Sequence, residues 1–229
     1  YGCVYFAAEM LATRDISLEG QACLVSGSGN VAQHTAEKLL EMGAKVITLS
    51  DSSGYIYDAS GIDRDKLAYV KHLKNVCRGR IKDYAEKYPS AVYTEADYSL
   101  DHNPLWGHRA VCAFPCATQN EINDKDAYNL INNNIKLVCE GASMPCSPEA
   151  VSIFQERNVL FALGKAANAG GVSVSGLEMT QNSMRLPWTR DEVHRVAVLD
   201  LDALAFLGLG GLGQPHGTGH LELAPGRHA

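Results

Sequence analysis

Short apolar runs alternate with amphipathic stretches along most of this chain, and this rhythm limits the fold more than any other feature of the sequence. Strands that alternate with helices form successive βα units, which assemble into a mostly parallel sheet covered by helices. The first unit comprises an expected strand over residues 21–26, a Gly-rich turn and a helix over 31–42. We therefore predict a doubly wound α/β domain with a mostly parallel sheet.

The other expected elements continue this pattern to about residue 195. Strands are expected at residues 45–49, 91–93, 111–114, 137–140 and 159–162, and helices at 1–11, 63–76, 81–87 and from Ser147 onward. Residues 52–62 read as a polar loop. No capping residue or leader precedes the first helix, which suggests that the chain starts inside a larger protein. Residues 196–229 contain many glycines and leucines and no lysine, so we expect an irregular tail.

Charge and cysteine content exclude several classes of protein. The 229 residues carry a net charge of -6, whereas a nucleic-acid surface needs clustered excess Lys and Arg. No apolar run approaches the roughly 20 residues of a membrane span. The seven cysteines form no Cys-x-x-Cys pair and their number is odd. These features favour a reducing, intracellular compartment, with the cytoplasm expected and the mitochondrion left open.

The turn that follows the first strand reads Gly27-Ser-Gly-Asn-Val-Ala32. A Gly-x-Gly-x-x-Ala segment is a weak signal alone, but between a strand and a helix it is typical of dinucleotide binding. Gly27 would form the tight turn, Gly29 would admit the pyrophosphate, and the following helix would point its N-terminal N–H groups at the phosphates. The alternative is a plain turn between two packed elements.

The end of the next strand bears on the choice of cofactor. Asp51 stands where a carboxylate usually accepts the ribose 2′-hydroxyl of NAD and repels the additional phosphate of NADP. Ser52 follows directly, and Lys71, Lys74, Arg78 and Arg80 lie in the next segment. A charge pair about 5 Å apart is worth roughly 3 kcal/mol at an effective dielectric near 20, so two such cations could outweigh Asp51. Alternatively, they form a solvated helix face.

Three further segments offer reactive or polar side chains. Thr118, Gln119 and Asn120 follow an expected strand, at the edge where open α/β sheets bind ligands. Cys112 and Cys116 fit small core residues better than nucleophiles or metal ligands. Lys165 could act as an amine catalyst if desolvated, although a charge at a helix start is the more ordinary reading. His216 and His220 lie among glycines, so no metal site is expected.

Several segments in their order and spacing resemble the cofactor-binding domain of NADP-type glutamate dehydrogenases over about residues 1–195. These segments are YGCVYFAAEML, GSGNVAQ, SDSSG, FPCATQNE, CEGASMPCSPEA and GKAANAGGVSVSGLEMTQN. The resemblance implies a Rossmann-like fold, NADP as cofactor and a homo-oligomer. It also implies oxidative deamination of glutamate to 2-oxoglutarate and ammonia.

The resemblance also implies roles for particular residues. Ser28, Gly29, Asn30 and Val31 would form the phosphate loop, Asp51 and Ser52 would contact the adenosine ribose, and Lys74 would bind the 2′-phosphate. Thr118, Gln119, Ala142 and Asn168 would contact the nicotinamide side, and Val172 and Ser175 would hold the far carboxylate of glutamate. No catalytic residue is expected within this chain, because the family's catalytic lysine and aspartate belong to a substrate domain that the sequence does not contain.

The chain departs from the family pattern at two positions. Ser143 replaces a usual Asn, and Leu163 replaces a usual Pro, which puts a nicotinamide-side hydrogen bond and a loop shape in question. Two alternative functions stay open. One is a nucleotide-binding fragment without turnover, and the other is a related leucine or phenylalanine dehydrogenase, although Ser175 favours a dicarboxylate substrate.

Overall fold

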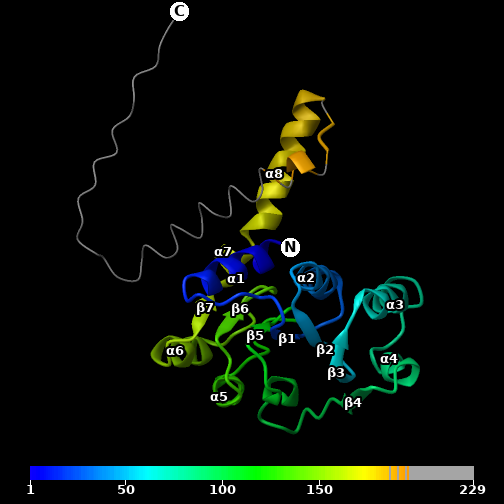
Figure 1. The fold of residues 1–229 in the computed structure, drawn as a ribbon, viewed down its shortest axis with the longest axis vertical. Coiled ribbons are helices and arrows are strands. Elements are labelled where there is room, and N and C mark those ends of the chain that lie inside the picture. Colours follow the sequence, from blue (N-terminus) through cyan, green and yellow to red (C-terminus); the bar gives the residue numbers. More distant parts are fainter. Residues whose placement is uncertain (186, 190, 194, 196–229) are drawn as a thin grey trace, which may run out of the picture.

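The computed structural model describes residues 1–185, 187–189, 191–193 and 195. Within these residues the core is a seven-stranded sheet in the order β4-β3-β2-β1-β5-β6-β7 (Figure 1). The strands are β1 (Ala22–Val25), β2 (Lys45–Asp51), β3 (Gly54–Ile62), β4 (Ala91–Glu95), β5 (Cys112–Phe114), β6 (Leu137–Cys139) and β7 (Leu160–Ala162). β1 lies between β2 and β5, so the winding direction reverses at the end of β1, where such sheets bind ligands.

Most neighbouring strands of the sheet run parallel. The parallel pairs are β1 with β2, β1 with β5, β5 with β6 and β6 with β7. The antiparallel pairs, β2 with β3 and β3 with β4, lie at one edge. The predicted mostly parallel, doubly wound sheet is therefore confirmed, with an antiparallel edge that the sequence did not suggest.

The prediction of a polar loop over residues 52–62 is wrong, because β3 occupies Gly54–Ile62. A buried Asp58 in the middle of this strand interrupts the apolar pattern and disguises it. The Asp58 carboxylate accepts hydrogen bonds from Lys66 Nζ and from the Tyr84 hydroxyl, each at 2.8 Å. A buried charge is tolerated when it is paired in this way, so the strand keeps its place in the sheet.

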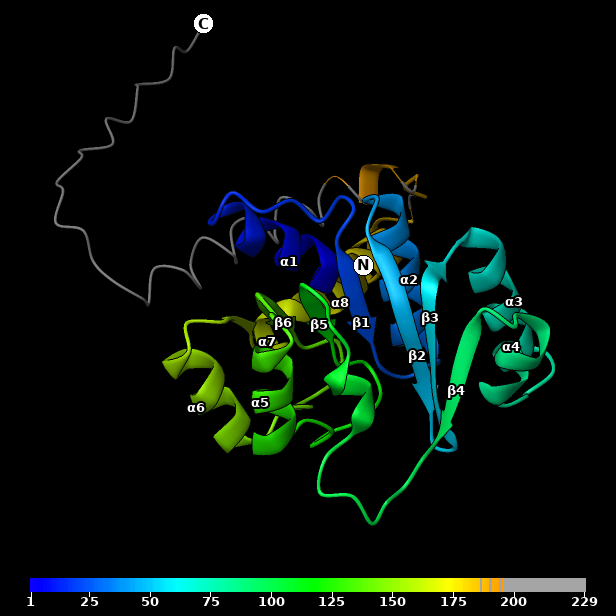
Figure 2. The ribbon, with the colours of Figure 1, turned by 60° about the horizontal axis from the view of Figure 1, so that its bottom comes forward.

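Helices cover both faces of the sheet (Figure 2). Each face has its own apolar cluster, and alternate residues of β1 supply them: Cys23 and Val25 face one cluster, and Leu24 faces the other. The first cluster includes residues of α1 (Gly2–Ala12), α2 (Asn30–Glu41), α3 (Arg64–Asn75) and α4 (Lys82–Lys87). The second includes residues of η1 (Pro104–Gly107), α5 (Asp124–Asn132) and α6 (Pro148–Glu156).

The last described helices connect back to the first. α7 (Gly164–Ala167) and α1 are in contact, and a side chain at Gly2 would lie 3.2 Å from Gly170 Cα. α8 (Ala169–Met184) extends away from the body of the domain and leaves Met179 largely exposed (Figure 1). Most of the α8 side chains that the structure describes are exposed.

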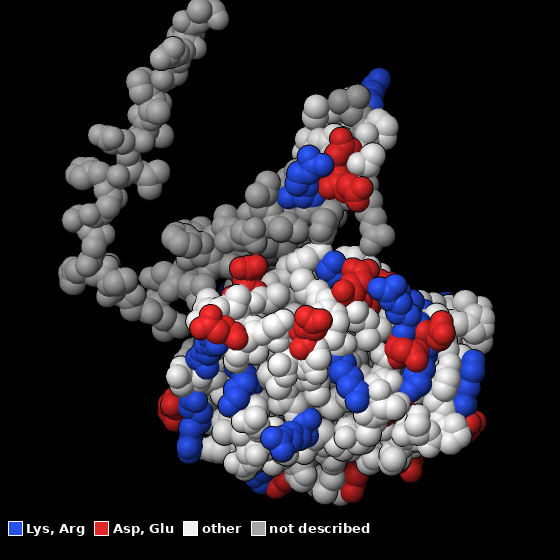
Figure 3. All heavy atoms as spheres, in the orientation of Figure 1, with Lys and Arg blue, Asp and Glu red and all other residues white. Residues whose placement is uncertain are grey.

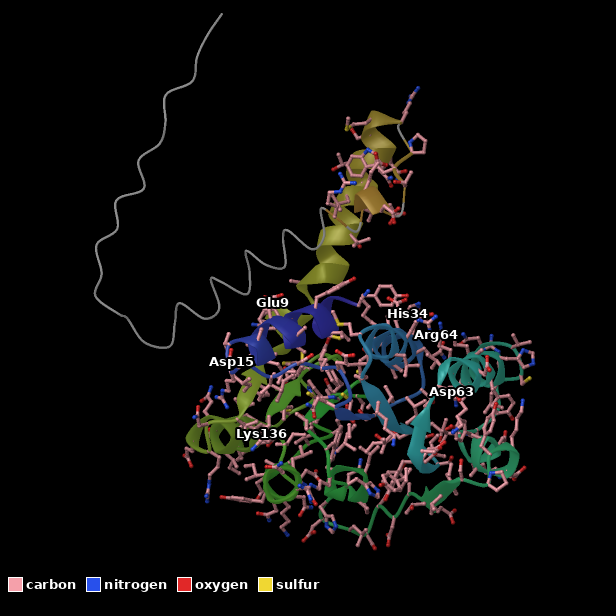
Figure 4. All side chains as sticks on the ribbon, viewed as in Figure 1. Glu9, Asp15, His34, Asp63, Arg64 and Lys136 are labelled. Atoms are coloured by element: carbon pink, nitrogen blue, oxygen red, sulfur yellow. The ribbon has the colours of Figure 1, made fainter. Side chains whose placement is uncertain are left out.

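The face of the domain seen in Figure 3 carries charges of both signs. In the face seen in Figure 3, Lys and Arg side chains are interspersed with Asp and Glu. Exposed polar residues occupy the outer sides of the helices, as Glu9 of α1, His34 of α2 and Arg64 of α3 show (Figure 4). Within the described ranges, no helix combines the length and the apolar character needed to cross a membrane.

Candidate functional site

A cavity of about 940 Å³ opens at the carboxyl ends of β1, β2 and β5, next to the point where the winding reverses. Its walls are the turn after β1, the end of β2, the loop after β4 and the loop after β5. The predicted site residues that line it are Ser28, Gly29, Asn30, Val31, Asp51, Ser52, Lys74 and Thr118. The fold thus brings most of the predicted cofactor residues to one cavity.

The glycine turn connects β1 to α2, so the expected strand-to-helix context is confirmed. Gly27 has φ +81°, a conformation that L side chains rarely adopt. Its N–H donates to Ser50 Oγ at 2.7 Å, and the Ser50 N–H donates to the Gly27 carbonyl at 3.0 Å. A Cβ on Gly27 would lie 3.0 Å from the Cys116 carbonyl oxygen. Glycine at this position therefore lets the turn lie against the loop after β5.

The first turn of α2 is arranged to receive an anion. Gly29 is the N-cap and supplies no side chain to bond the free N–H groups of the helix. Such N–H groups, together with the positive end of the helix dipole, form an anion site. The exposed backbone of Gly29 and Asn30 borders the cavity.

Gln33 supports this turn and was not singled out in the sequence. Its buried side-chain amide donates to the Ser28 carbonyl at 2.8 Å. The same amide exchanges two hydrogen bonds with Asn75 at the end of α3, at 3.0 and 3.2 Å. A polar residue on the buried face of an amphipathic helix was the available signal. Gln33 therefore connects the glycine turn to the end of α3.

Asp51 is the most heavily hydrogen-bonded carboxylate of the cavity. It accepts from the Ser53 hydroxyl at 2.6 Å, from Lys74 Nζ at 2.9 Å and from the Ile81 N–H at 2.8 Å. Partial burial opposes ionisation, but these hydrogen bonds prevail and lower the pKa of Asp51 to about 2. Asp51 is therefore a paired anion at neutral pH rather than a free one.

The cations near Asp51 occupy different places. Arg80 donates to Ser52 Oγ at 2.8 Å, beside the cavity. Lys71 instead donates to Glu37 Oε1 at 2.5 Å on another part of the surface. Lys74 and Arg80 therefore flank the end of β2, while Lys71 belongs to a separate ion pair. Tyr98, which the sequence did not single out, donates from its hydroxyl to the Ser52 carbonyl at 2.6 Å.

The predicted nicotinamide and substrate residues are less closely gathered. Gln119 is exposed beside Thr118, and Asn168 Nδ2 donates to the Ala142 carbonyl at 3.2 Å. Ser175 is exposed on α8 and donates to the Gly171 carbonyl at 3.1 Å. The side chain of Val172 lies outside the described part of the structure. The structure thus joins Ala142 to Asn168 but does not place them in the walls of the 940 Å³ cavity.

Leu163 and Ser143, the two departures from the family pattern, both lie in loops that follow strands of the sheet. Leu163 is the N-cap of α7 with φ −61°, which is the angle that a proline would impose, so the loop keeps a proline-like backbone. Ser143 is exposed in the loop after β6.

The other reactive side chains considered in the sequence have ordinary structural settings where the structure describes them. Lys165 is exposed at the start of α7, as an ordinary helix-start charge would be. Cys112 and Cys116 are buried, and burial raises the pKa of the Cys116 thiol. Within the described residues, no cluster of three or more His, Cys, Asp or Glu side chains could hold a metal. His216 and His220 lie outside those residues.

Comparison with known proteins places the chain in a family. The sequence profile of glutamate/leucine/phenylalanine/valine dehydrogenases matches residues 1–199. The chain belongs to this dehydrogenase family. It is 58% identical over 193 residues to the NAD(P)-specific glutamate dehydrogenase of Xylanibacter ruminicola, covering 84% of this chain and 42% of that protein.

Other glutamate dehydrogenases are similar to this chain to a comparable extent. The NADP-specific glutamate dehydrogenase of Helicobacter pylori is 54% identical over 194 residues, covering 84% of this chain and 43% of that protein. Glutamate dehydrogenase 2 of Plasmodium falciparum superposes with a TM-score of 0.84 at 46% identity, covering 90% of this chain and 44% of the other. This family chain therefore spans less than half the length of the relatives it matches.

Proposed function

We propose that this chain is the cofactor-binding half of an NADP-dependent glutamate dehydrogenase, which converts glutamate to 2-oxoglutarate and ammonia. The observation that carries the proposal is the placement of Lys74 and Arg80 at Asp51 and Ser52, beside the glycine turn that begins α2. A dinucleotide with a 2′-phosphate requires an anion site at a helix N-terminus and cations at the end of the second strand.

Different residues of the cavity would bind different parts of the cofactor. The pyrophosphate would lie on the N–H groups of Gly29, Asn30 and Val31, next to Ser28. The adenosine ribose would contact Asp51 and Ser52, and its 2′-phosphate would be held by Lys74 and Arg80. The pairing of Asp51 with Lys74 reduces the repulsion that its carboxylate would otherwise exert on that phosphate.

Another group of residues would bind the nicotinamide end of the cofactor and the amino-acid substrate. Thr118, Gln119, Ala142 and Asn168 would orient the nicotinamide ribose and carboxamide, and Val172 and Ser175 would hold the far carboxylate of glutamate. Bound NADP supplies the hydride acceptor, C4 of the nicotinamide. The proton-transferring lysine and aspartate of the reaction are expected in a substrate domain, and the full-length protein is expected to form a homo-oligomer.

Titration calorimetry with NADP and NAD tests the cofactor assignment. We expect tighter binding of NADP, and a loss of this preference in Lys74→Ala. Equal or tighter binding of NAD that is unaffected by Lys74→Ala would refute NADP as the cofactor.

Activity measurements test whether catalysis needs both this cofactor-binding chain and a separate substrate domain. Hydride transfer needs both reactants in near-attack geometry, which accounts for about 7–11 kcal/mol of the barrier. We expect the 229-residue chain alone to give no NADPH from glutamate and NADP. A substrate domain of the family supplied in trans should restore turnover. Robust turnover by the chain alone would show that catalytic residues lie within it, and Lys165 would be the first to mutate.

Two alternatives are distinguished by the same assays. A nucleotide-binding module would bind NADP but gain no activity from the added substrate domain. A leucine or phenylalanine dehydrogenase would gain activity toward an apolar amino acid in preference to glutamate. The names of the glutamate dehydrogenases that this chain matches at 54–58% identity favour glutamate.

A further inference from the structure

Glu121 lies in the loop between β5 and α5 and lines the cavity. Its Oε1 accepts the N–H of Ala117 at 3.0 Å and that of Thr118 at 3.4 Å. The Ser26 hydroxyl, just after β1, lies near enough to the Glu121 carboxylate to lower its pKa. The carboxylate thus lies beside the ends of two adjacent parallel strands, β1 and β5, where the winding direction reverses.

The backbone next to this carboxylate is closely packed where the loop leaves β5. Ser26 Oγ accepts the Cys116 N–H at 2.8 Å, and Gly27 lies against Cys116 and Ala117. At the far end of the loop, the N–H of Asn120 donates to the Met144 carbonyl at 3.0 Å. Residues 117–120 between these two anchors are exposed. Glu121 is therefore the side chain that holds the exposed stretch at its start.

We propose that Glu121 is a positioning residue for the dinucleotide: its carboxylate fixes residues 117–118 against the glycine turn of residues 27–32, a contact that we call the Glu121 clamp. The identity of the ligand rests on the proposed function above. A carboxylate that accepts N–H groups makes charge-assisted hydrogen bonds, which are about twice as strong as those of a neutral acceptor. Glu121→Gln removes the charge but keeps an acceptor oxygen, so it should weaken the hydrogen bonds to the Ala117 and Thr118 N–H groups without abolishing them.

The surroundings set the pH at which the clamp would titrate. Desolvation raises the pKa of Glu121 to about 7, against the lowering effect of the nearby Ser26 hydroxyl and of the hydrogen bonds from the Ala117 and Thr118 N–H groups. Asp126 of α5 adds to the upward shift through its negative charge. The other titratable neighbours are Cys116 after β5 and Cys146 before α6, whose thiols have pKa values raised by burial and stay neutral. The Glu121 side chain is thus mostly ionised above about pH 7 and mostly neutral below it.

The test compares Glu121→Gln with the parent chain and with Glu156→Gln, an exposed matched control at the end of α6. The first measurement follows the amide resonances of Ala117 and Thr118 by NMR from pH 5.5 to 8.5 without cofactor. We expect a transition with a midpoint near the pKa of about 7 in the parent and in the control, and none in Glu121→Gln.

The second measurement is NADPH binding, followed by fluorescence at pH 6 and pH 8. The 2′-phosphate also titrates, with a pKa near 6, but its effect is common to all three proteins. At pH 8 we expect Glu121→Gln to bind NADPH about 3- to 10-fold more weakly than the parent and the Glu156→Gln control, which corresponds to one weakened hydrogen bond of about 0.7–1.4 kcal/mol.

The outcomes separate this inference from the proposed function. Amide resonances of residues 117 and 118 that do not titrate, or that titrate equally in Glu121→Gln, would overturn the clamp. Titrating amides with identical NADPH profiles in all three proteins would overturn its role in positioning the cofactor. Titrating amides in a parent that binds no NADPH would refute the cofactor assignment while the clamp itself stands.

Discussion

The ammonium group of Lys74 lies 2.9 Å from Oδ2 of Asp51, at the end of β2 in the 940 Å³ cavity. An acidic residue at this strand end is usually a sign of NAD, because it repels a 2′-phosphate. Here the carboxylate is already paired and hydrogen-bonded, so its presence does not exclude NADP.

Substitution of Lys74 should affect NADP much more than NAD. Lys74→Ala removes a cation from the 2′-phosphate and leaves the Asp51 charge unpaired beside it. The loss of one charge-assisted hydrogen bond costs about 1.5–3 kcal/mol, so NADP affinity should fall about 10- to 100-fold. Lys71→Ala is the matched control, because Lys71 pairs with Glu37 away from the cavity. Calorimetry that shows equal losses for the two variants would contradict this assignment.

The Asp51 network should contribute to stability in a defined pH range. The folded-state pKa of about 2 lies below the usual value of 3.8, so the contribution is complete above about pH 4 and disappears as the pH falls toward 2. Asp51→Asn should therefore lower the melting temperature at pH 7, and the difference from the parent should shrink below pH 4. A difference that is the same at pH 7 and pH 3 would show that packing, not charge, is responsible.

Glu121 should have the opposite effect on stability. Its pKa is raised from 4.5 to about 7 in the folded state, so ionisation costs stability progressively as the pH rises from 4.5 to 7. Glu121→Gln should melt higher than the parent at pH 8 and at about the same temperature near pH 4.5. Calorimetric melting at the two pH values measures this. A variant less stable than the parent at pH 8 would mean that the lost hydrogen bonds outweigh the cost of the charge.

Replacing Gly27 or Gly29 of the glycine turn by alanine should affect different properties, stability in one case and NADP binding in the other. At Gly27 the left-handed backbone and the 3.0 Å approach to the Cys116 carbonyl both oppose a side chain, so Gly27→Ala should lose about 1–3 kcal/mol of unfolding free energy. At Gly29 a Cβ meets no atom within 4 Å, and φ is −81°. Gly29→Ala should fold normally but bind NADP more weakly. Urea unfolding and calorimetry separate the two effects.

The sequence predicted the central part of the fold because its strands are short apolar runs flanked by clear helix signals. The turn after β1 and the start of α6, where Ser147 Oγ accepts the Ala150 N–H at 3.2 Å, follow directly from residue type. β3 was missed because the partners of Asp58, Lys66 and Tyr84, are recognisable only in three dimensions. α5 was missed although Asn123 and Asp126 form a capping box that the sequence displays.

The candidate site was predictable to a similar extent. Glycines and the charged residues at strand ends mark the cavity in the sequence, since their positions follow from the βα pattern. The distinction between Lys71, paired with Glu37, and Lys74, paired with Asp51, depends on which face of α3 each occupies. The supporting roles of Gln33 and Glu121 depend on contacts between separate loops and helices, which no local pattern reveals.

The packing of α1 has a consequence for how the domain is made. α1 covers β6 and β7, and the Cys3 carbonyl accepts a hydrogen bond from Cys139 Sγ at 3.2 Å across a separation of 136 residues. Contacts between such distant parts of the chain form slowly. During synthesis α2, which also contacts α1, emerges soon after it, whereas β6 and β7 emerge much later. The part of α1 that packs on β6 and β7 therefore lacks these partners until about residue 162 has been synthesised. Until then it is a transiently exposed apolar surface of the kind that promotes aggregation during folding.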